Sequence, residues 1–135
     1  MHHTTPPSVD DIASLAEAAL GALPLELRTS VRGIAILVEE VPEDEVLEEM
    51  GLDHPWELTG LYRGVPLTER SVTDLPRGPD TIVLFRESIL VEWIETGEDL
   101  FRLVRNVIIH EVGHHFGFSD TEIARLEEEG DDAAP

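Results

Sequence analysis

The sequence predicts an α+β fold in which a small sheet packs against a long helix, with further helices flanking it. Apolar residues recur at helical spacing in several segments, which predicts amphipathic helices. Two short apolar runs, at 31–38 and 81–85, are typical of buried strands. A chain of 135 residues, 41% of them hydrophobic, is long enough for one core, so we expect a single domain.

The chain is predicted to begin with a helix and then a strand. Ser8, followed by two aspartates, is a typical start for a helix, and apolar residues from Ile12 to Leu23 keep the helical spacing. The run VRGIAILV at 31–38 then predicts a buried strand.

A short acidic helix is predicted next. Pro42 suits its first turn and Gly51 its C-cap, and its inner face is expected to carry Val46, Leu47 and Met50. Seven carboxylates lie between positions 39 and 49. They form either a solvated helix face or a surface that recruits a basic partner.

The segment 52–79 is rich in glycine and proline. Within it, LTGLYRGVPL predicts a short hairpin around Arg63 and Gly64, and Pro66 would confine that strand to a sheet edge. The turn sequence PRGPD leads into the strand predicted at 81–85.

Three helices are predicted in the C-terminal part. The first follows the strand and ends at Gly97, with an inner face of Ile89, Leu90, Trp93 and Ile94. The second runs from about Glu98 to Phe116, and the third spans about 120–129. We therefore expect a flexible leader at 1–7, one domain at 8–129 and a loose acidic tail at 130–135.

The charge and the cysteine content limit the partners and metal ligands that the protein can have. Twenty-nine acidic against nine basic residues give a formal net charge of −20, which disfavours nucleic-acid and membrane partners. No cysteine is present, so histidine and carboxylate would have to hold any transition metal. The N-terminal stretch lacks a basic region typical of signal peptides, so we expect a cytoplasmic protein.

The segment around His110 carries the chemical signal. His110 and His114 are four residues apart, so on a helix they share one face and can meet one tetrahedral zinc ion. Glu111, one position on, can reach a water bound to that metal and act as general base. His115 points elsewhere on the helix and is expected to pack.

A third metal ligand is expected from the turn that follows. Gly117 can end the helix with a positive φ and turn the chain back, which lets Asp120 approach the two histidines. The alternative is local, because Ser119-Asp120-Thr121-Glu122 resembles a capping box that opens the last helix. Both roles are compatible. Three protein ligands would leave a fourth position for water, as in catalytic zinc sites.

The motif HEVGHHFGFSD, with GLYRGVPLTERS at 60–71 and LPRGPDTIVLFRESI at 75–89, resembles a family of small zincin-like metallopeptidases, the minimal zincins. The resemblance covers about residues 30–129. It implies a reduced zincin fold and one Zn²⁺ per chain, with His110, His114 and Asp120 as ligands and Glu111 as base.

A peptidase of this kind also needs contacts to the substrate. We expect the strand at 81–85 to pair with the substrate backbone. Candidates for stabilising the tetrahedral oxyanion are the side chains of the irregular region before it, namely His54, Tyr62, Arg63 and Arg70.

The leading hypothesis is zinc-dependent hydrolysis of peptide bonds in a neutral or basic peptide or protein substrate. One alternative is a catalytically quiet zinc-binding module that recognises a protein partner. Another is a zinc amidase that acts on a non-peptide substrate. The same ligands would also accept iron, cobalt or manganese, and the sequence leaves the oligomeric state open.

Overall fold

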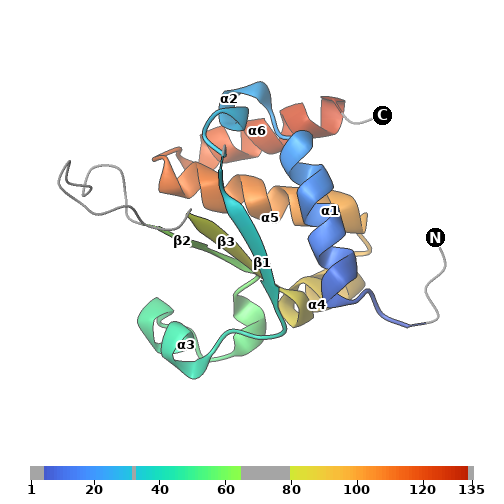
Figure 1. Ribbon diagram of the computed structural model, residues 1–135, viewed down its shortest axis with the longest axis vertical. Coiled ribbons are helices and arrows are strands. Elements are labelled where there is room, and N and C mark those ends of the chain that lie inside the picture. Colours follow the sequence, from blue (N-terminus) through green and yellow to red (C-terminus); the bar gives the residue numbers. More distant parts are fainter. Residues whose placement is uncertain (1–4, 32, 65–79, 134–135) are drawn as a thin grey trace.

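The computed structural model describes residues 5–31, 33–64 and 80–133. In these ranges it contains six α-helices, one short 3₁₀ helix and a three-stranded mixed sheet, which confirms the α+β class (Figure 1). In chain order the elements are α1 (Val9–Gly21), α2 (Leu25–Arg28), β1 (Ala35–Glu39), α3 (Asp44–Met50), η1 (Pro55–Glu57), β2 (Gly60–Arg63), β3 (Thr81–Phe85), α4 (Arg86–Thr96), α5 (Leu100–His115) and α6 (Asp120–Ala133).

The strand order is β1-β3-β2, with β1 parallel and β2 antiparallel to β3. The expectation that the strand at 81–85 offers an edge to substrate is therefore wrong, because both edges of β3 are paired. Its continuous apolar sequence, TIVLF, is typical of a strand buried on both faces. Among the described residues β2 pairs with β3, and the predicted hairpin partner around Pro66 lies outside them.

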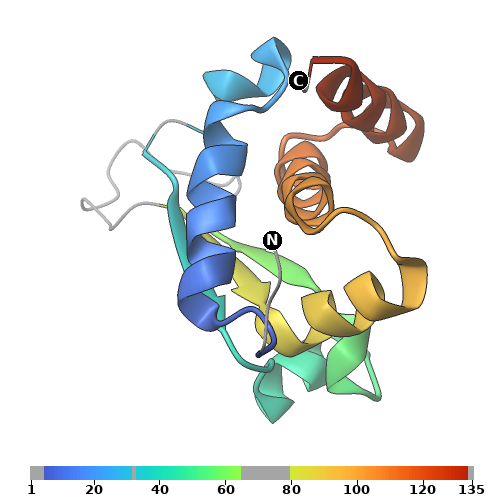
Figure 2. The same cartoon turned by 90° about the vertical axis from the view of Figure 1, so that its right-hand side faces the viewer.

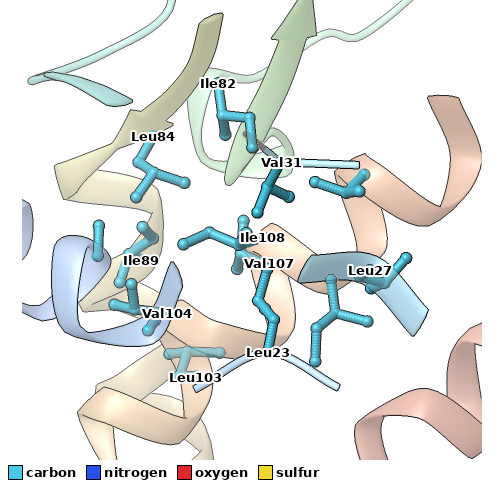
Figure 3. Packing of buried hydrophobic residues seen from close by; sticks show 14 of the residues in the cluster. Leu23, Leu27, Val31, Ile82, Leu84, Ile89, Leu103, Val104, Val107 and Ile108 are labelled. Carbon is cyan, nitrogen blue, oxygen red and sulfur yellow. The ribbon is translucent and has the colours of Figure 1, made fainter. Parts of the chain in front are cut away.

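Alternation along β3 divides the apolar side chains between the two faces of the sheet. Ile82 and Leu84 face the main core, where they meet residues of the helices, such as Val107 and Ile108 of α5 (Figure 3). Val83 and Phe85 face the opposite side and pack with a smaller cluster, which includes Leu58, Val46, Leu52 and Leu61. The central strand thus joins two apolar layers.

Helix α5 packs against α1, α6 and the strand β2, while α1 also packs directly on β1. In Figure 2 helix α5 is seen nearly end-on, with α1 on one side and α6 above it. The contact with α6 is very close at Gly113, where a methyl group would lie 2.7 Å from Cγ1 of Ile123. The N-terminal cap of α1 is the predicted one, because Ser8 and Asp11 accept each other's backbone N–H groups.

The last helix is longer than predicted. The structure continues α6 to Ala133, so the expectation of a loose tail from 130 is wrong for residues 130–133. Arg105 of α5 is only 2% exposed and donates to Asp131, while Gly130 lies against its guanidinium group. A buried cation needs a partner. Asp131 supplies it from the last turn of α6, and the pair holds that turn against α5.

The predicted leader is also shorter at its C-terminal end. Pro7 is buried, and its carbonyl oxygen accepts a hydrogen bond of 2.6 Å from Nε of Arg86. The expectation of a flexible segment is therefore wrong at this residue, because Arg86 ties it to the start of α4. Residues 1–4 lie outside the described ranges.

Two predicted inward side chains point to solvent. Ile94 is 75% exposed and Met50 is 49% exposed. Each lies near the end of a short helix, where the helix has already left the core. The glycines that follow these helices, Gly51 and Gly97, have positive φ values of 68° and end them as predicted.

None of the helices in the described ranges combines the length and the apolar composition needed to cross a bilayer.

The close contact at Gly113 gives the first prediction. Gly113→Ala forces Ile123 away from α5, and we expect a loss of about 1–3 kcal/mol in the free energy of unfolding. Gly21→Ala, at the end of α1, has no atom within 4 Å of its new methyl group and is the matched control. We expect it to be neutral or to stabilise by up to about 1 kcal/mol. Urea unfolding in the presence of a chelator measures both, and a Gly113→Ala protein as stable as wild type contradicts the prediction.

Candidate active site

The histidine motif lies in the last two turns of α5. Asp99 caps the start of this helix by accepting the backbone N–H of Arg102. At the other end Gly117 has a φ of 83°, and its N–H donates to the carbonyl of His114. Phe118 N–H donates to the carbonyl of Gly113 at 2.8 Å, which completes a Schellman motif. The helix therefore ends just after the second histidine, and the chain reverses there as predicted.

The two motif histidines lie one above the other on the helix. The ring centroids of His110 and His114 are 4.4 Å apart, with an angle of 33° between the planes. Both residues are exposed, so the rings are accessible from solvent. This is the arrangement that the four-residue spacing requires.

Asp120 is brought to the same place by the reversed chain. Its Oδ1 lies 3.1 Å from Nε2 of His114. The capping box is present as well, but Ser119 and Glu122 form it by accepting each other's backbone N–H groups. Because Ser119 performs the capping, the Asp120 side chain is left to approach His114. The capping box and the contact of Asp120 with His114 therefore coexist.

Glu111 occupies a less polar position than its neighbours. It is partly buried between α5 and β2, where a methyl group on Gly60 would lie 3.4 Å from Cγ of Glu111 and 2.8 Å from Cγ1 of Val107. This burial raises the pKa of Glu111 from 4.5 to about 7. A carboxylate with such a pKa can accept and release a proton near neutral pH.

The pKa of His110 is lowered as well. Partial desolvation has the largest effect, the neighbouring His114 lowers the pKa further, and Asp120 raises it. The lowered pKa favours the neutral imidazole, which is the form that ligates metals.

The donor set suits zinc in its chemistry. Two imidazoles and one carboxylate match known zinc ligand sets. The 3.1 Å between His114 and Asp120 is close to the separation of about 3.3 Å between two ligands around a tetrahedral zinc ion. The three side chains meet in pairs, however, and within the described ranges no three histidine or acidic side chains surround a single metal position.

The family model of the zincin-like metallopeptidases matches residues 31–130 of the chain. The chain belongs to this family. The match agrees with the extent of the resemblance seen in the sequence, and the α+β architecture is consistent with a small zincin-like domain. No curated protein matches the zincin-like chain.

The three predicted oxyanion candidates that the structure describes make separate contacts. Tyr62 donates its hydroxyl to Oδ2 of Asp80 at 2.8 Å. Arg63 lies 3.9 Å from Glu39. His54 accepts the N–H of Trp56 in the cap of η1, and Arg70 lies outside the described residues.

Tyr62 makes a second contact that the sequence did not indicate. Its ring stacks on His115 at a centroid distance of 3.8 Å and an angle of 14°. His115 follows His114 directly, so the stack connects the edge strand β2 to the last turn of α5. Nε2 of His115 is buried and has no hydrogen-bond partner among the described residues. The expectation that this histidine packs is confirmed.

A pocket of about 400 Å³ adjoins the motif, and His110 and Glu111 form part of its lining. Its other acidic residues come from outside the motif, with Glu92 on α4, Glu98 between α4 and α5, and Glu127 on α6. No local spacing could have indicated these three residues, because they belong to separate segments that only the fold brings together.

The raised pKa of Glu111 gives a prediction for the metal-free protein. The folded state holds the proton more tightly than the unfolded chain, so the stability contribution of Glu111 falls as pH rises from 4.5 to about 7 and is constant above. Glu111→Gln removes this loss. We expect the free energy of unfolding of the variant, taken relative to wild type, to be roughly 2–3 kcal/mol higher at pH 8 than at pH 5.

Urea unfolding at the two pH values, with a chelator present, measures this difference. Glu48→Gln on the exposed side of α3 controls for the general effect of removing one negative charge. If Glu111→Gln shows no larger pH difference than Glu48→Gln, Glu111 is not desolvated in the folded protein.

Proposed function

We propose that this zincin-like protein hydrolyses peptide bonds with one zinc ion and with Glu111 as general base. The observation that carries the proposal is the placement of Glu111 beside two accessible histidines whose rings are neighbours, with Asp120 returned to His114 by the turn at Gly117. Membership of the zincin-like metallopeptidase family supports the same chemistry.

His110, His114 and Asp120 would hold the metal. Zinc in such a site polarises the scissile carbonyl and acidifies water. The carboxylate of Glu111 would accept a proton from the attacking water and deliver it to the leaving amine. The partial burial of Glu111 by β2 keeps bulk water from competing for that proton.

The edge strand β2 replaces β3 as the proposed position of the substrate backbone. Within the described ranges β2 has a single sheet neighbour, β3, and its first residue, Gly60, lies against Glu111. An extended peptide that adds to this edge would place a carbonyl group near the general base. The net charge of −20 favours a neutral or basic peptide.

Two matched measurements test the proposal. Elemental analysis after dialysis against zinc is expected to give one zinc per chain in wild type, loss of zinc in His114→Ala and weaker binding in Asp120→Ala. Hydrolysis of a peptide library is then compared between wild type and Glu111→Gln. We expect a loss of about 10²–10⁴-fold in kcat at unchanged zinc content.

The other outcomes are distinct. Zinc binding without hydrolysis of any peptide would indicate the quiet binding module. Zinc binding with cleavage of small amides alone would indicate an amidase. Peptide hydrolysis that survives Glu111→Gln would remove this glutamate from the mechanism, and the absence of zinc binding would overturn the proposal as a whole.

A further inference from the structure

The pocket beside the motif shares two residues with it. His110 and Glu111 line one part of it, and Leu103, Asn106 and Val107 extend its lining along α5 toward the N-terminal end of that helix. Its volume of about 400 Å³ falls within the usual range for ligand pockets. A peptide that presents its scissile carbonyl to Glu111 would therefore direct a neighbouring side chain into this pocket.

The charge of the lining has one sign. Glu92, Glu98 and Glu127 contribute carboxylates. Neither Glu92 nor Glu127 forms an ion pair within 4 Å in the part of the chain that the structure describes. Both are only partly exposed. Unpaired carboxylates in a partly desolvated pocket create a strong negative potential there.

The pKa values of Glu92 and Glu127 reflect the same crowding of negative charge. Burial raises the pKa of Glu92, and repulsion from Glu98 adds to the effect. Burial also raises the pKa of Glu127. The positive charge of Arg105 lowers this pKa in part, and the negative charges of Asp131 and Glu98 raise it. A cation placed in the pocket would relieve the repulsion among these groups.

We infer that this pocket binds a cationic side chain, arginine or lysine, next to the scissile bond of the substrate. The inference rests on the proposed peptidase function and specifies its substrate class. An elongated side chain suits the lining because the carboxylates come from three separate segments along the pocket. The apolar contacts with Leu103 and Val107 suit the methylene groups of such a side chain.

A metal ion fits the lining less well than an organic cation does. Glu92, Glu98 and Glu127 come from three separate segments of the pocket lining. A guanidinium or ammonium group at the end of a flexible chain can instead engage the carboxylates one or two at a time.

The test measures binding without hydrolysis, so it is independent of the proposed activity. The probes are N-acetyl-arginine amide and N-acetyl-citrulline amide, which have nearly the same shape but differ in charge, and N-acetyl-lysine amide as the second cation. Titrations of the metal-free wild-type protein are followed by NMR at physiological salt. We expect both cationic amides to bind about 10-fold more tightly than the citrulline amide, with shifts confined to the residues lining the pocket.

Variants then assign the effect to the pocket. Glu92→Gln and Glu127→Gln are each expected to weaken binding of the arginine amide about 5- to 10-fold. Both remove a destabilised charge and are not expected to impair folding. Glu45→Gln, on exposed α3, removes the same formal charge far from the pocket and is expected to leave the affinity unchanged.

Three results would overturn the inference. These are equal affinity for the arginine and citrulline amides, an equal loss in Glu45→Gln, and displacement of the arginine amide by stoichiometric Mg²⁺. The second would mean general attraction to an acidic protein, and the third would assign the pocket to a metal ion. Cation binding in a protein that hydrolyses no peptide would support the pocket while removing the proposed function, so the two fail separately.

Discussion

Helix α5 is held against β2 on one side and α6 on another at distances that only glycine permits. A side chain on Gly60 would collide with Val107, and one on Gly113 would collide with Ile123. These two contacts decide how deeply Glu111 is buried and how closely α6 follows α5. Partial desolvation of the glutamate and the approach of the aspartate from α6 are both consequences of this close packing.

Electrostatics fixes the other half of α5. Arg105 is the largest fully buried side chain in the described part of the chain, and a guanidinium group in that position requires compensation. Asp131 and Asn106 provide it, and the hydrogen bond from Arg105 lowers the pKa of Asp131. The core thus contains one strongly held ion pair. In the pocket beside it Glu98 lies 4.0 Å from Arg102, and Arg105 only partly offsets the raised pKa of Glu127.

Features governed by local spacing could be predicted from the sequence. The cap at Ser8, the helix end at Gly117 and the neighbouring rings of the two motif histidines each depend on residues within five positions of one another. The α+β class followed from periodicity, because helical and strand patterns differ over short windows. The family resemblance followed from the motif and its neighbouring segments and agrees with the matched range.

Features governed by distant pairing could not be predicted in the same way. A run such as TIVLF marks a buried strand, but its position in the centre of the sheet depends on the partners β1 and β2. The stack of Tyr62 on His115 and the anchoring of Pro7 by Arg86 join residues more than 50 positions apart. Neither contact leaves a periodic trace in the sequence, and the acidic pocket is hidden for the same reason.

Helix α6 is attached to α5 at both of its ends. Asp120 at its first residue contacts His114, and Asp131 near its last residue pairs with Arg105. Eleven residue steps of a helix span about 16 Å, so these two attachments act on one stiff lever. The position of Asp120 beside His114 therefore depends on how the far end of the same helix docks on Arg105. The C-terminal turn, remote from the histidines, in this sense helps to place an aspartate beside them.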